Sequence, residues 1–393
     1  MRLSPLLLAT AALLVGCGSR GDAESAAAPA PAAGASVQAP ITGPQRGAAK
    51  PFDATPVAKF AAPWAMTFLP DGRMLVTEKA GQMLLVSADG KTRRTVTTIA
   101  AVDSAGQGGL MDVVLHPGFP QNRLVYFSYS TAGQGGKGVV LARGRLAGKP
   151  GAETLDGIET IFRASPLVEG NGHYSGRIAF APDGKLFFTN GERQQFDPAQ
   201  DPRVTLGKVL RLNDDGTPAA DNPLSAKGFH PAVWSYGHRN LLGIAFDAKG
   251  RLWEQEMGPK GGDEVNLILP GRNYGYPIVS NGDHYDGRVI PDHSTQPEFE
   301  APKVSWNPVI SPAGLMFYSG ALFPAWQGSA FIGGLSSKAL VRIAFDGDTA
   351  REAERFDMGA RIREVEQGPD GALWVLEDGE SGGRLLRLMP KPG

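Results

Sequence analysis

A tight turn followed by a short apolar strand recurs six times along this chain of 393 residues. Each copy has a turn rich in Pro, Asp or Gly and then a run of apolar or alternating residues, as in FAPDGKLFFTNGE. The copies start about 45–75 residues apart, and one propeller blade of four strands needs about 40–50 residues. The six copies occupy residues 68–81, 116–130, 180–192, 246–258, 322–335 and 368–379.

This repeat restricts the chain to a few all-β architectures. Amphipathic helical stretches are nearly absent, and 52 glycines with 31 prolines supply the many turns that short strands require. We therefore predict an all-β fold, a six-bladed β-propeller over residues 52–393, with a pair of large β-sandwiches as the alternative. In a propeller, loops from several blades meet on one face, so a site would draw single residues from distant segments.

The N-terminal residues have the pattern of a secretion signal. Arg2 supplies a positive start, and the apolar stretch at 6–15 is too short to span a bilayer. It ends beside Cys17, the only cysteine of the chain, where bacterial lipoproteins are lipidated. We predict a lipoprotein signal peptide over residues 1–17, the alternative being an ordinary signal peptide with a coincidental cysteine. Because Gly18 and not Asp follows the cysteine, we expect a periplasmic protein held by its lipid at the outer membrane.

Residues 18–51 are rich in Ala, Pro and Gly and contain few large apolar side chains. Such a segment cannot bury enough apolar surface to order itself, so we predict a disordered tether between the lipid and the propeller. The formal net charge of −1 gives no indication of a nucleic-acid partner, and the lipid is the only membrane contact that we expect.

Polar and charged side chains in different repeats are candidates for a shared site. GNGHYSGR places His173 at the start of a strand, on backbone that glycines leave free to adopt unusual conformations. Arg361 and Arg363 are two apart, so on a strand both face the same side. A lone cation at a strand end is usually solvated, but several converging ones suit a small polyanion, because Arg binds carboxylates in a bidentate manner. The remaining candidates are Gln107, Arg239, Asn240 and Lys338.

The segment EMGPKGGDEVNL at 256–267 is a candidate cation-binding loop. It offers free carbonyl groups on a Gly-Pro turn and two acidic side chains, and oxygen ligands of this kind suit a hard cation such as Ca²⁺. By itself this is a weak signal. The chain has no strand-to-helix GxGxxG fingerprint for dinucleotides and no CxxCH haem motif.

Over residues 55–390 the chain resembles the soluble quinoprotein glucose and aldose sugar dehydrogenases, which use pyrroloquinoline quinone (PQQ). The resemblance implies a six-bladed propeller, in agreement with the repeat. The stretches that carry it occur in the family's order: PWAMTFLPDG, GQGGLMDVVLHPGF, HYSGRIAFAPDG, SYGHRNLLGIAF, EMGPKGGDEVNLILPGRNYGYP, LSSKALVRI and RIREVEQGPDG.

The resemblance also implies roles for individual residues. His173 matches the catalytic base, which takes the proton of the sugar hydroxyl at C1 while hydride passes to PQQ. Arg239 matches a residue that contacts the quinone and stabilises negative charge on its oxygen. The other implied PQQ contacts are Gln107, Asn240, Lys338, Arg361 and Arg363.

Further implied roles concern calcium and the sugar. The carbonyl groups of Gly258 and Pro259 match ligands of a Ca²⁺ ion that bridges protein and cofactor. Trp306 falls where the family often has an aromatic residue at the sugar entrance. Asp263, Glu264 and Tyr274 match a region that binds further calcium in some members.

One departure from the family pattern concerns the support of His173. Members commonly have Asp after the following strand, whereas this chain has Glu192, one methylene longer. Glutamate could still hold the histidine. Arg177 is expected to orient the loop and has no catalytic role.

We therefore expect a PQQ-dependent aldose sugar dehydrogenase that forms a lactone and passes electrons to a quinone or a small redox carrier. One alternative is a Ca²⁺-dependent propeller lactonase or other hydrolase, which would need inward-facing acids on several blades. The other is a non-catalytic propeller that binds glycans or a protein.

Overall fold

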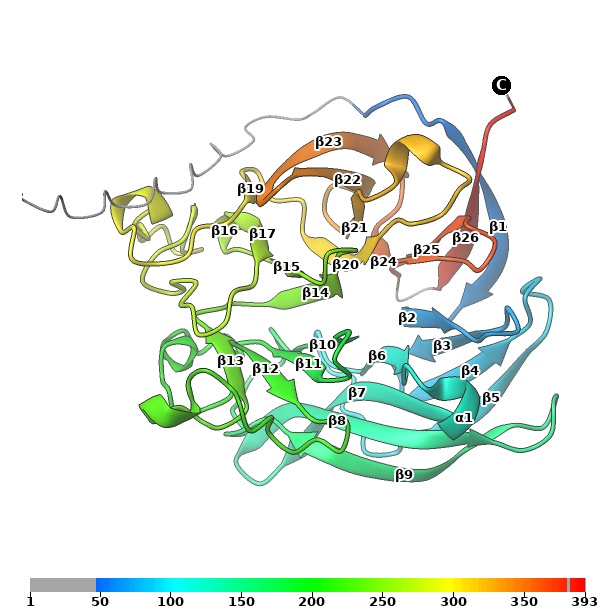
Figure 1. Ribbon diagram of the computed structural model, residues 1–393, viewed down its shortest axis with the longest axis horizontal. Coiled ribbons are helices and arrows are strands. Elements are labelled where there is room, and N and C mark those ends of the chain that lie inside the picture. Colours follow the sequence, from blue (N-terminus) through cyan, green and yellow to red (C-terminus); the bar gives the residue numbers. More distant parts are fainter. Residues whose placement is uncertain (1–46, 380–381, 393) are drawn as a thin grey trace, which may run out of the picture. The chain divides into compact units, whose positions relative to one another are not determined.

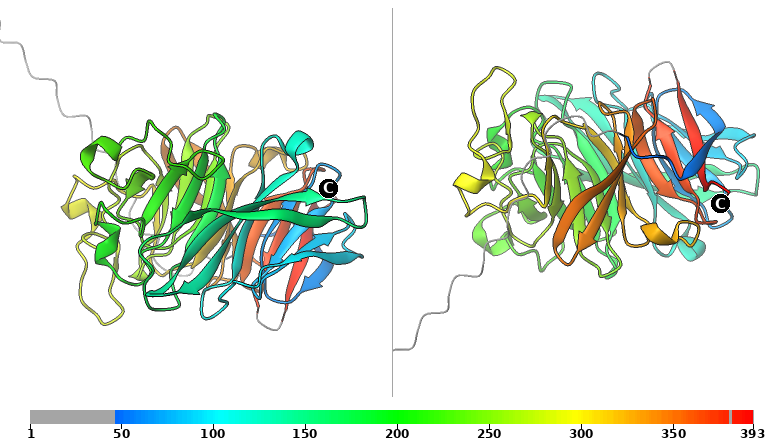
Figure 2. Two further views of the ribbon diagram at one scale, coloured as in Figure 1. Left: turned by 90° about the horizontal axis from the view of Figure 1, so that it is seen from below. Right: turned by 90° about the horizontal axis from the view of Figure 1, so that it is seen from above.

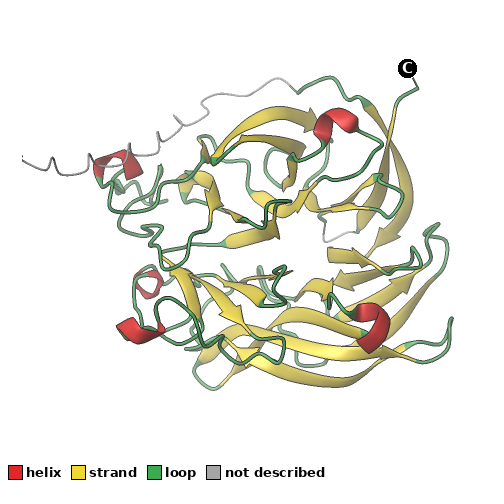
Figure 3. Ribbon diagram, in the orientation of Figure 1, coloured by secondary structure: helices red, strands yellow, loops and turns green. Residues whose placement is uncertain are grey.

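The computed structural model describes residues 47–379 and 382–392 (Figure 1). Within these residues the strands form six four-stranded antiparallel sheets, which Figure 1 shows arranged around a common centre. The six-bladed β-propeller predicted from the repeat is confirmed. Loops and very short helices connect the strands (Figure 3), and no helix of the described part is both long and apolar enough to cross a membrane.

Each of the first three blades is built from four consecutive strands. Blade 1 consists of β2 (Pro63–Phe68), β3 (Met74–Glu78), β4 (Gln82–Val86) and β5 (Arg93–Thr98). Blade 2 consists of β6 (Leu110–Leu115), β7 (Leu124–Gly133), β8 (Gly136–Ala147) and β9 (Thr154–Arg163). Blade 3 consists of β10 (Ser175–Phe180), β11 (Leu186–Asn190), β12 (Lys208–Leu212) and β13 (Val233–Tyr236).

The other three blades complete the ring. Blade 4 consists of β14 (Leu241–Phe246), β15 (Leu252–Glu256), β17 (Asp263–Leu267) and β19 (Val304–Trp306). Blade 5 consists of β20 (Pro312–Phe317), β21 (Ala330–Gly334), β22 (Ala339–Asp346) and β23 (Thr349–Asp357). Blade 6 consists of β24 (Ile362–Gln367), β25 (Leu373–Glu377), β26 (Gly383–Pro390) and β1 (Phe52–Phe60).

Blade 6 joins the two ends of the domain. Its outer strand β1 pairs antiparallel with β26, from Phe52 opposite Pro390 to Phe60 opposite Gly383. Figure 2 shows these first and last strands side by side in both views. The ring is therefore closed by backbone hydrogen bonds between its N-terminal and C-terminal strands.

Short elements decorate the blades. They are α1 (Phe119–Asn122), the 3₁₀ turns η1 (Asp197–Ala199), η2 (Ser225–Lys227), η3 (His293–Thr295) and η4 (Pro324–Trp326), and the two-stranded sheet of β16 (Lys260–Gly261) and β18 (Gly282–Asp283).

The six sequence repeats coincide with one connection in each blade, the turn from the innermost strand to the second. In blade 3, for example, Gly184 adopts a φ of 81° and its N–H donates to the carbonyl of Ala181. Glycine is favoured there because other residues rarely adopt this left-handed conformation. The strand that follows, Leu186–Asn190, is buried along its whole length, which explains the apolar run after each turn.

The innermost strands share a length of six residues and a register shift near their start, which marks a β-bulge. The third residue of each strand lies at or next to the bulge. From blade 1 to blade 6 these third residues are Ala65, Asp112, Arg177, Gly243, Gly314 and Glu364. One cation, two acids and three small residues thus occupy equivalent positions.

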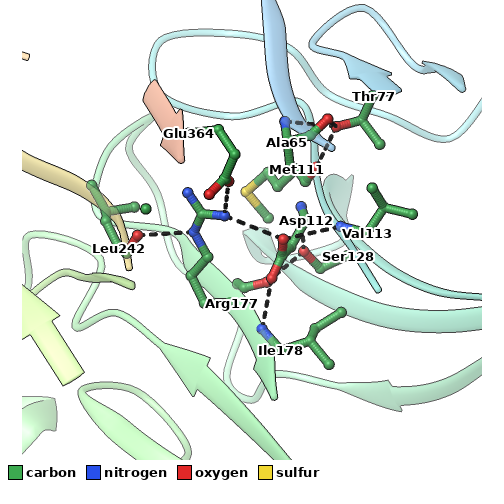
Figure 4. A network of polar contacts seen from close by, with 12 residues as sticks. Ala65, Thr77, Met111, Asp112, Val113, Ser128, Arg177, Ile178, Leu242 and Glu364 are labelled. Carbon is green, nitrogen blue, oxygen red and sulfur yellow. Dashed lines mark hydrogen bonds and ion pairs between the residues drawn. The ribbon is translucent and has the colours of Figure 1, made fainter. Parts of the chain in front are cut away.

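Arg177 links these positions through a buried polar network (Figure 4). Its Nη1 donates to Asp112 Oδ1 at 3.2 Å and also to the Glu364 carboxylate. Its Nε donates to the carbonyl of Leu242 at 2.9 Å, and its guanidinium lies 4.2 Å from the centre of the Trp64 ring. One side chain of blade 3 therefore contacts blades 1, 2, 4 and 6.

Burial opposes ionisation of both acids in this network. It raises the pKa of Asp112 above its ordinary value and raises the pKa of Glu364 to about 7, while Arg177 acts in the opposite direction on each. Arg177 therefore favours the charged form of both buried carboxyl groups against the effect of burial.

We expect Arg177→Met to lower the free energy of unfolding by about 3–5 kcal/mol, because it leaves two buried acids without their cation. Urea denaturation followed by tryptophan fluorescence measures the change. The matched control is Arg203→Met, because that side chain is 81% exposed in its pair with Asp201 and its loss should leave the free energy of unfolding almost unchanged. Equal losses for the two variants would contradict the role assigned to Arg177.

Candidate functional site

All six blades contribute to a polar cavity of about 420 Å³ on one face of the ring. The first residue of each innermost strand pairs with the end of the second strand, as Ser175 does with Asn190 and Ile362 with Glu377. The starts and ends of these strands therefore meet on the same face. One lining residue from the region of each blade, in order, is Trp64, Gln107, Ser175, Asn240, Ser311 and Arg363.

Backbone strain gathers around this cavity. Among its lining residues, Ala62, Ser175 and Ser311 have positive φ angles of 50°, 59° and 51°, and the neighbouring His173 has a φ of 50°. Such angles are uncommon for residues other than glycine and cost of order 1–3 kcal/mol each. They persist only where the surrounding structure enforces them, which is typical of functional sites.

His173 directly precedes the lining residues Tyr174 and Ser175, is not itself among the lining residues, and is held by contacts to two side chains. Its backbone N–H donates to Gln107 Oε1 at 2.7 Å, and its Nδ1 is hydrogen-bonded to Glu192 Oε1. A side chain at Gly191 would collide with the His173 carbonyl, since a Cβ there would lie 2.1 Å from that oxygen. The close approach of the two segments therefore requires glycine.

The pKa shifts of His173 and Glu192 indicate which of the two side chains carries the proton. Burial lowers the pKa of His173 below 6.5, although Glu192 acts to raise it. Burial is the largest single effect and raises the pKa of Glu192, but the contacts with His173, the backbone N–H of Phe196 and the charge of Arg239 together outweigh it, so the net pKa is lowered. At pH 7 the glutamate is therefore ionised and accepts the Nδ1 proton of a neutral imidazole, which leaves Nε2 as the basic nitrogen.

Arg239 lies beside the cavity with one nitrogen free to bind an acceptor. Its Nη1 donates to the carbonyls of Met257 at 2.8 Å and Gly258 at 2.6 Å. Its Nε is buried and has no hydrogen-bond partner within the described residues. The neighbouring Asn240, which lines the cavity, accepts a hydrogen bond from Ser175 Oγ at 3.3 Å. A buried donor without a partner is costly, so the site is complementary to a ligand oxygen.

Two arginines from the region of blade 6 line the cavity. Arg361 and Arg363 each form an ion pair with Asp378, at 2.7 Å and 2.8 Å. Burial alone would raise the pKa of Asp378, but the two guanidinium groups lower it by more. The net pKa lies below its ordinary value, so the carboxylate is charged. Lys338 is exposed and is not among the lining residues. The structure thus brings Gln107, Asn240, Arg361 and Arg363 together and leaves Lys338 outside.

The segment that follows β15 forms a second, smaller cavity, lined by Arg239, Gly258, Glu264, Tyr274 and His293. The carbonyl of Tyr274 accepts from His293 Nε2 at 3.1 Å, and its hydroxyl donates to the carbonyl of Leu267 at 2.6 Å. Burial and the nearby Glu256 raise the pKa of Glu264 well above its ordinary value. Pro259 is buried next to Gly258.

Asp263 accepts three backbone hydrogen bonds. Its Oδ1 accepts from the backbone N–H of Gly258 at 2.9 Å, and its Oδ2 accepts from the backbone N–H groups of Ile310 at 2.8 Å and Ser311 at 2.7 Å. Burial raises its pKa to about 7 against the lowering effect of these bonds. The carboxylate therefore connects backbone segments of blades 4 and 5, and its calcium role stays a prediction from the family resemblance.

Trp306 requires a correction. It was expected at the sugar entrance, but it is fully buried in β19 and its Nε1 donates to Glu352 Oε2 at 2.6 Å. It packs in the apolar core shared by blades 4 and 5. Successive side chains of a strand point to opposite faces, and Trp306 takes the face of β19 that lies between the blades and away from the cavity.

Two cavity residues were missed by the sequence analysis. Asp378 follows β25 and pairs with both arginines, a partnership that the cross-strand pairing of Ile362 with Glu377 could have indicated. Tyr285 lies in an irregular loop and reaches the same cavity. No local pattern in that loop indicates its position.

Comparison with known proteins agrees with this geometry. A family model described as Glucose / Sorbosone dehydrogenase matches residues 60–387. Aldose sugar dehydrogenase YliI of Escherichia coli is 39% identical over 341 residues, which are 85% of this chain and 91% of that protein. Quinoprotein glucose dehydrogenase B of Acinetobacter calcoaceticus is 30% identical over 298 residues, which are 69% of this chain and 61% of that protein.

Solved structures show the same fold. The apo form of the soluble aldose sugar dehydrogenase of Escherichia coli matches with a TM-score of 0.82 and 36% identity, covering 86% of this chain and 100% of that one. The PQQ-bound aldose sugar dehydrogenase of Streptomyces coelicolor matches with a TM-score of 0.71 and 28% identity, covering 88% and 99%. This chain belongs to the glucose/sorbosone dehydrogenase family.

We expect the imidazole of His173 to titrate below pH 6.5, because burial disfavours its charged form. Glu192→Gln removes the partner that raises this pKa, so the midpoint should move to still lower pH. NMR titration of the histidine ring signals, assigned with His173→Ala, measures both values without any assay of activity. A midpoint above 6.5, or an upward shift in Glu192→Gln, would show that the pair is organised differently.

Proposed function

We propose that this protein is a PQQ-dependent aldose sugar dehydrogenase that oxidises its substrate at the anomeric carbon to a lactone. The observation that carries the proposal is the buried, neutral His173, fixed by Glu192 beside a cavity that arginines line. The names of the relatives, which include a PQQ-bound structure, support the same assignment.

The residues of the cavity fit PQQ, a planar quinone with three carboxylates. Arg361 and Arg363 would bind carboxylate groups in competition with Asp378, since guanidinium groups match carboxylates in charge and geometry. The unpartnered Nε of Arg239 would donate to a quinone oxygen. Gln107 and Asn240 would supply further polar contacts, whereas Lys338, which the family resemblance implies as another contact, lies outside the cavity lining.

The environment of Arg239 also fits a calcium ion. The carbonyl oxygens of Met257 and Gly258 both accept from its guanidinium, so the electrostatic potential at these oxygens favours a cation. The carbonyls of Gly258 and Pro259 would hold Ca²⁺ beside the cofactor. Glu264 and the carbonyl of Tyr274 would serve a further ion. Bound PQQ, polarised by Ca²⁺, would supply the acceptor for the hydride that leaves the anomeric carbon.

The side chains of this protein would perform the proton chemistry. Nε2 of His173 would take the hydroxyl proton from the sugar as the anomeric C–H bond breaks and the C=O bond of the lactone forms. Glu192 would keep the imidazole in the tautomer whose Nε2 is basic and would stabilise the imidazolium that results. Arg239 would stabilise negative charge as it develops in the cavity.

We expect the purified protein to reduce a dye with glucose or other aldoses only after addition of both PQQ and Ca²⁺. His173→Ala should retain PQQ binding, followed by its absorbance, and lose turnover by a factor on the order of 10²–10⁴ because it lacks the base. His230→Ala is the matched control, since that ring holds a turn by accepting the N–H of Ala232 and does not line the cavity.

The outcomes of this reconstitution separate the alternatives. Absence of PQQ binding would refute the proposal and would favour the alternatives, a propeller hydrolase or a glycan-binding propeller. PQQ binding with undiminished turnover in His173→Ala would refute the role of that residue alone.

The proposal extends to the location of the enzyme. Cys17 and the signal pattern lie outside the described residues, and their sequence supports a lipid anchor with the propeller on the periplasmic side. Electrons from the sugar would pass to a quinone or a small redox carrier. The tether predicted at 18–51 would be shorter than that range, because Ala48 donates to the Arg355 carbonyl and Pro51 accepts from the Lys391 N–H on the propeller.

We expect the full-length protein, expressed in a bacterial host, to incorporate labelled palmitate and to sediment with outer-membrane vesicles. Cys17→Ala should abolish the label and release the protein from the membrane fraction. Label in neither protein would show that the cysteine is coincidental.

A further inference from the structure

The connection between β11 and β12 of blade 3 is long and strained. It runs from residue 191 to residue 207, whereas the loop of a β-hairpin usually has about two to five residues. Arg193, Gln194 and Phe196 adopt positive φ angles of 63°, 62° and 63°. Such angles are uncommon for residues other than glycine and persist only where the surrounding structure enforces them. The connection also carries the glutamate that holds the proposed base, so whatever enforces its shape bears on the chemistry.

The side chain of Lys208, the first residue of β12, is fully buried and donates to three carbonyl groups of this connection. Its Nζ lies 2.7 Å from the oxygen of Pro198, 3.0 Å from that of Ala199 and 2.7 Å from that of Leu206. An ammonium group has three donors, so all of them are used. Burial lowers the pKa of Lys208 to about 7, but a neutral amine would have only two donors for the three carbonyls. The surroundings therefore fit the charged form.

Two of the three carbonyls belong to the short turn that contacts Glu192. Pro198 and Ala199 lie in η1, and the N–H of Ala199 donates to the carbonyl of Phe196 at 3.1 Å. The N–H of Phe196 in turn donates to Glu192 Oε2 at 2.8 Å. The other oxygen of this carboxylate, Oε1, is hydrogen-bonded to Nδ1 of His173. A continuous series of contacts therefore leads from the buried ammonium group to the imidazole.

We propose that Lys208 is a positioning residue for the proposed base, because it fixes η1 and thereby the Phe196 N–H that orients Glu192. Leu206 lies at the end of the connection and Pro198 in its middle, so one ammonium group joins two parts of a strained segment. Lys208 is not among the residues that line the cavity, and it acts only through this segment. The inference rests on the proposed function.

The experiment follows the ring signals of His173 by NMR in the full-length, cofactor-free protein labelled with ¹⁵N-histidine, assigned with His173→Ala. In the unmodified protein the Nδ1 proton that Glu192 accepts should give a low-field resonance protected from exchange with water. Lys208→Met removes the ammonium group at similar volume, so this proton should exchange about tenfold faster or its signal should be lost. After reconstitution kcat should fall by a factor on the order of 10–10², with PQQ binding and KM for glucose unchanged.

Leu210→Ala is the matched control for a general loss of stability. It removes buried atoms from the same strand but no hydrogen bond of the connection. It should therefore lower the midpoint of unfolding and leave the Nδ1 signal and kcat unchanged. Lys208→Gln keeps two donors on a shorter side chain, and its Nδ1 exchange should lie between those of the unmodified protein and Lys208→Met.

The same variants distinguish failure of this inference from failure of the proposed function. An unaltered Nδ1 signal in Lys208→Met would overturn the inference, as would an unaltered signal in Lys208→Gln if the methionine variant does not fold. Equal effects in Leu210→Ala would also overturn it, because Lys208 would then act only through stability. Weakened PQQ binding would assign Lys208 to the support of the cofactor instead. If the unmodified protein oxidises no aldose, the proposed function fails, whereas the Nδ1 signals still decide whether Lys208 positions the pair.

Discussion

The architecture depends on a single buried cation shared between blades. Arg177 pairs with Asp112 and Glu364, which occupy the third position of the innermost strands of blades 2 and 6, and its Nε donates to the Leu242 carbonyl of blade 4. Small residues at the equivalent positions leave space for this arrangement. A Cβ on Gly314 would lie 2.7 Å from Glu364 Oε1, so the acid and the glycine are complementary. A buried charge is stable only when all its partners are in place. Arg177 therefore stabilises one relative arrangement of the blades.

This network also supports the cavity. In blades 1, 2, 4 and 6 the second residue of the innermost strand lines the cavity, and in blades 2, 3 and 6 the third residue belongs to the network. Trp64 lines the cavity and lies under the Arg177 guanidinium, and the carbonyl of Arg363 accepts a weak bond from Arg177 Nη2 at 3.5 Å. The residues that face a ligand are therefore positioned by those that hold the ring together.

The sequence predicted the blades better than it predicted the site. Turn chemistry marks the same connection in every blade, so the six repeats identified the propeller. The strand β1 has no such repeat, and its pairing with β26 could not be predicted from local pattern. Arg361 and Arg363 were predicted to face the same side and both pair with Asp378, although Arg361 directly precedes β24 and only Arg363 lies on it. Trp306 was misplaced, because a strand aromatic residue has the same local pattern whether it faces a cavity or the space between blades. Asp378 and Tyr285 depend on long-range contacts that spacing does not encode.

The pairing of β1 with β26 has a consequence for the order in which the molecule forms. Of the described strands, the one that completes blade 6 is synthesised first and its partner last. Contacts between such distant segments form slowly, because a long loop must close before hydrogen bonds compensate for the lost entropy. A chain that ends early would keep an unpaired edge on blade 6, a surface prone to aggregation. The cavity therefore exists only after the ring has closed, and a nascent chain cannot bind a ligand there until β26 has paired with β1.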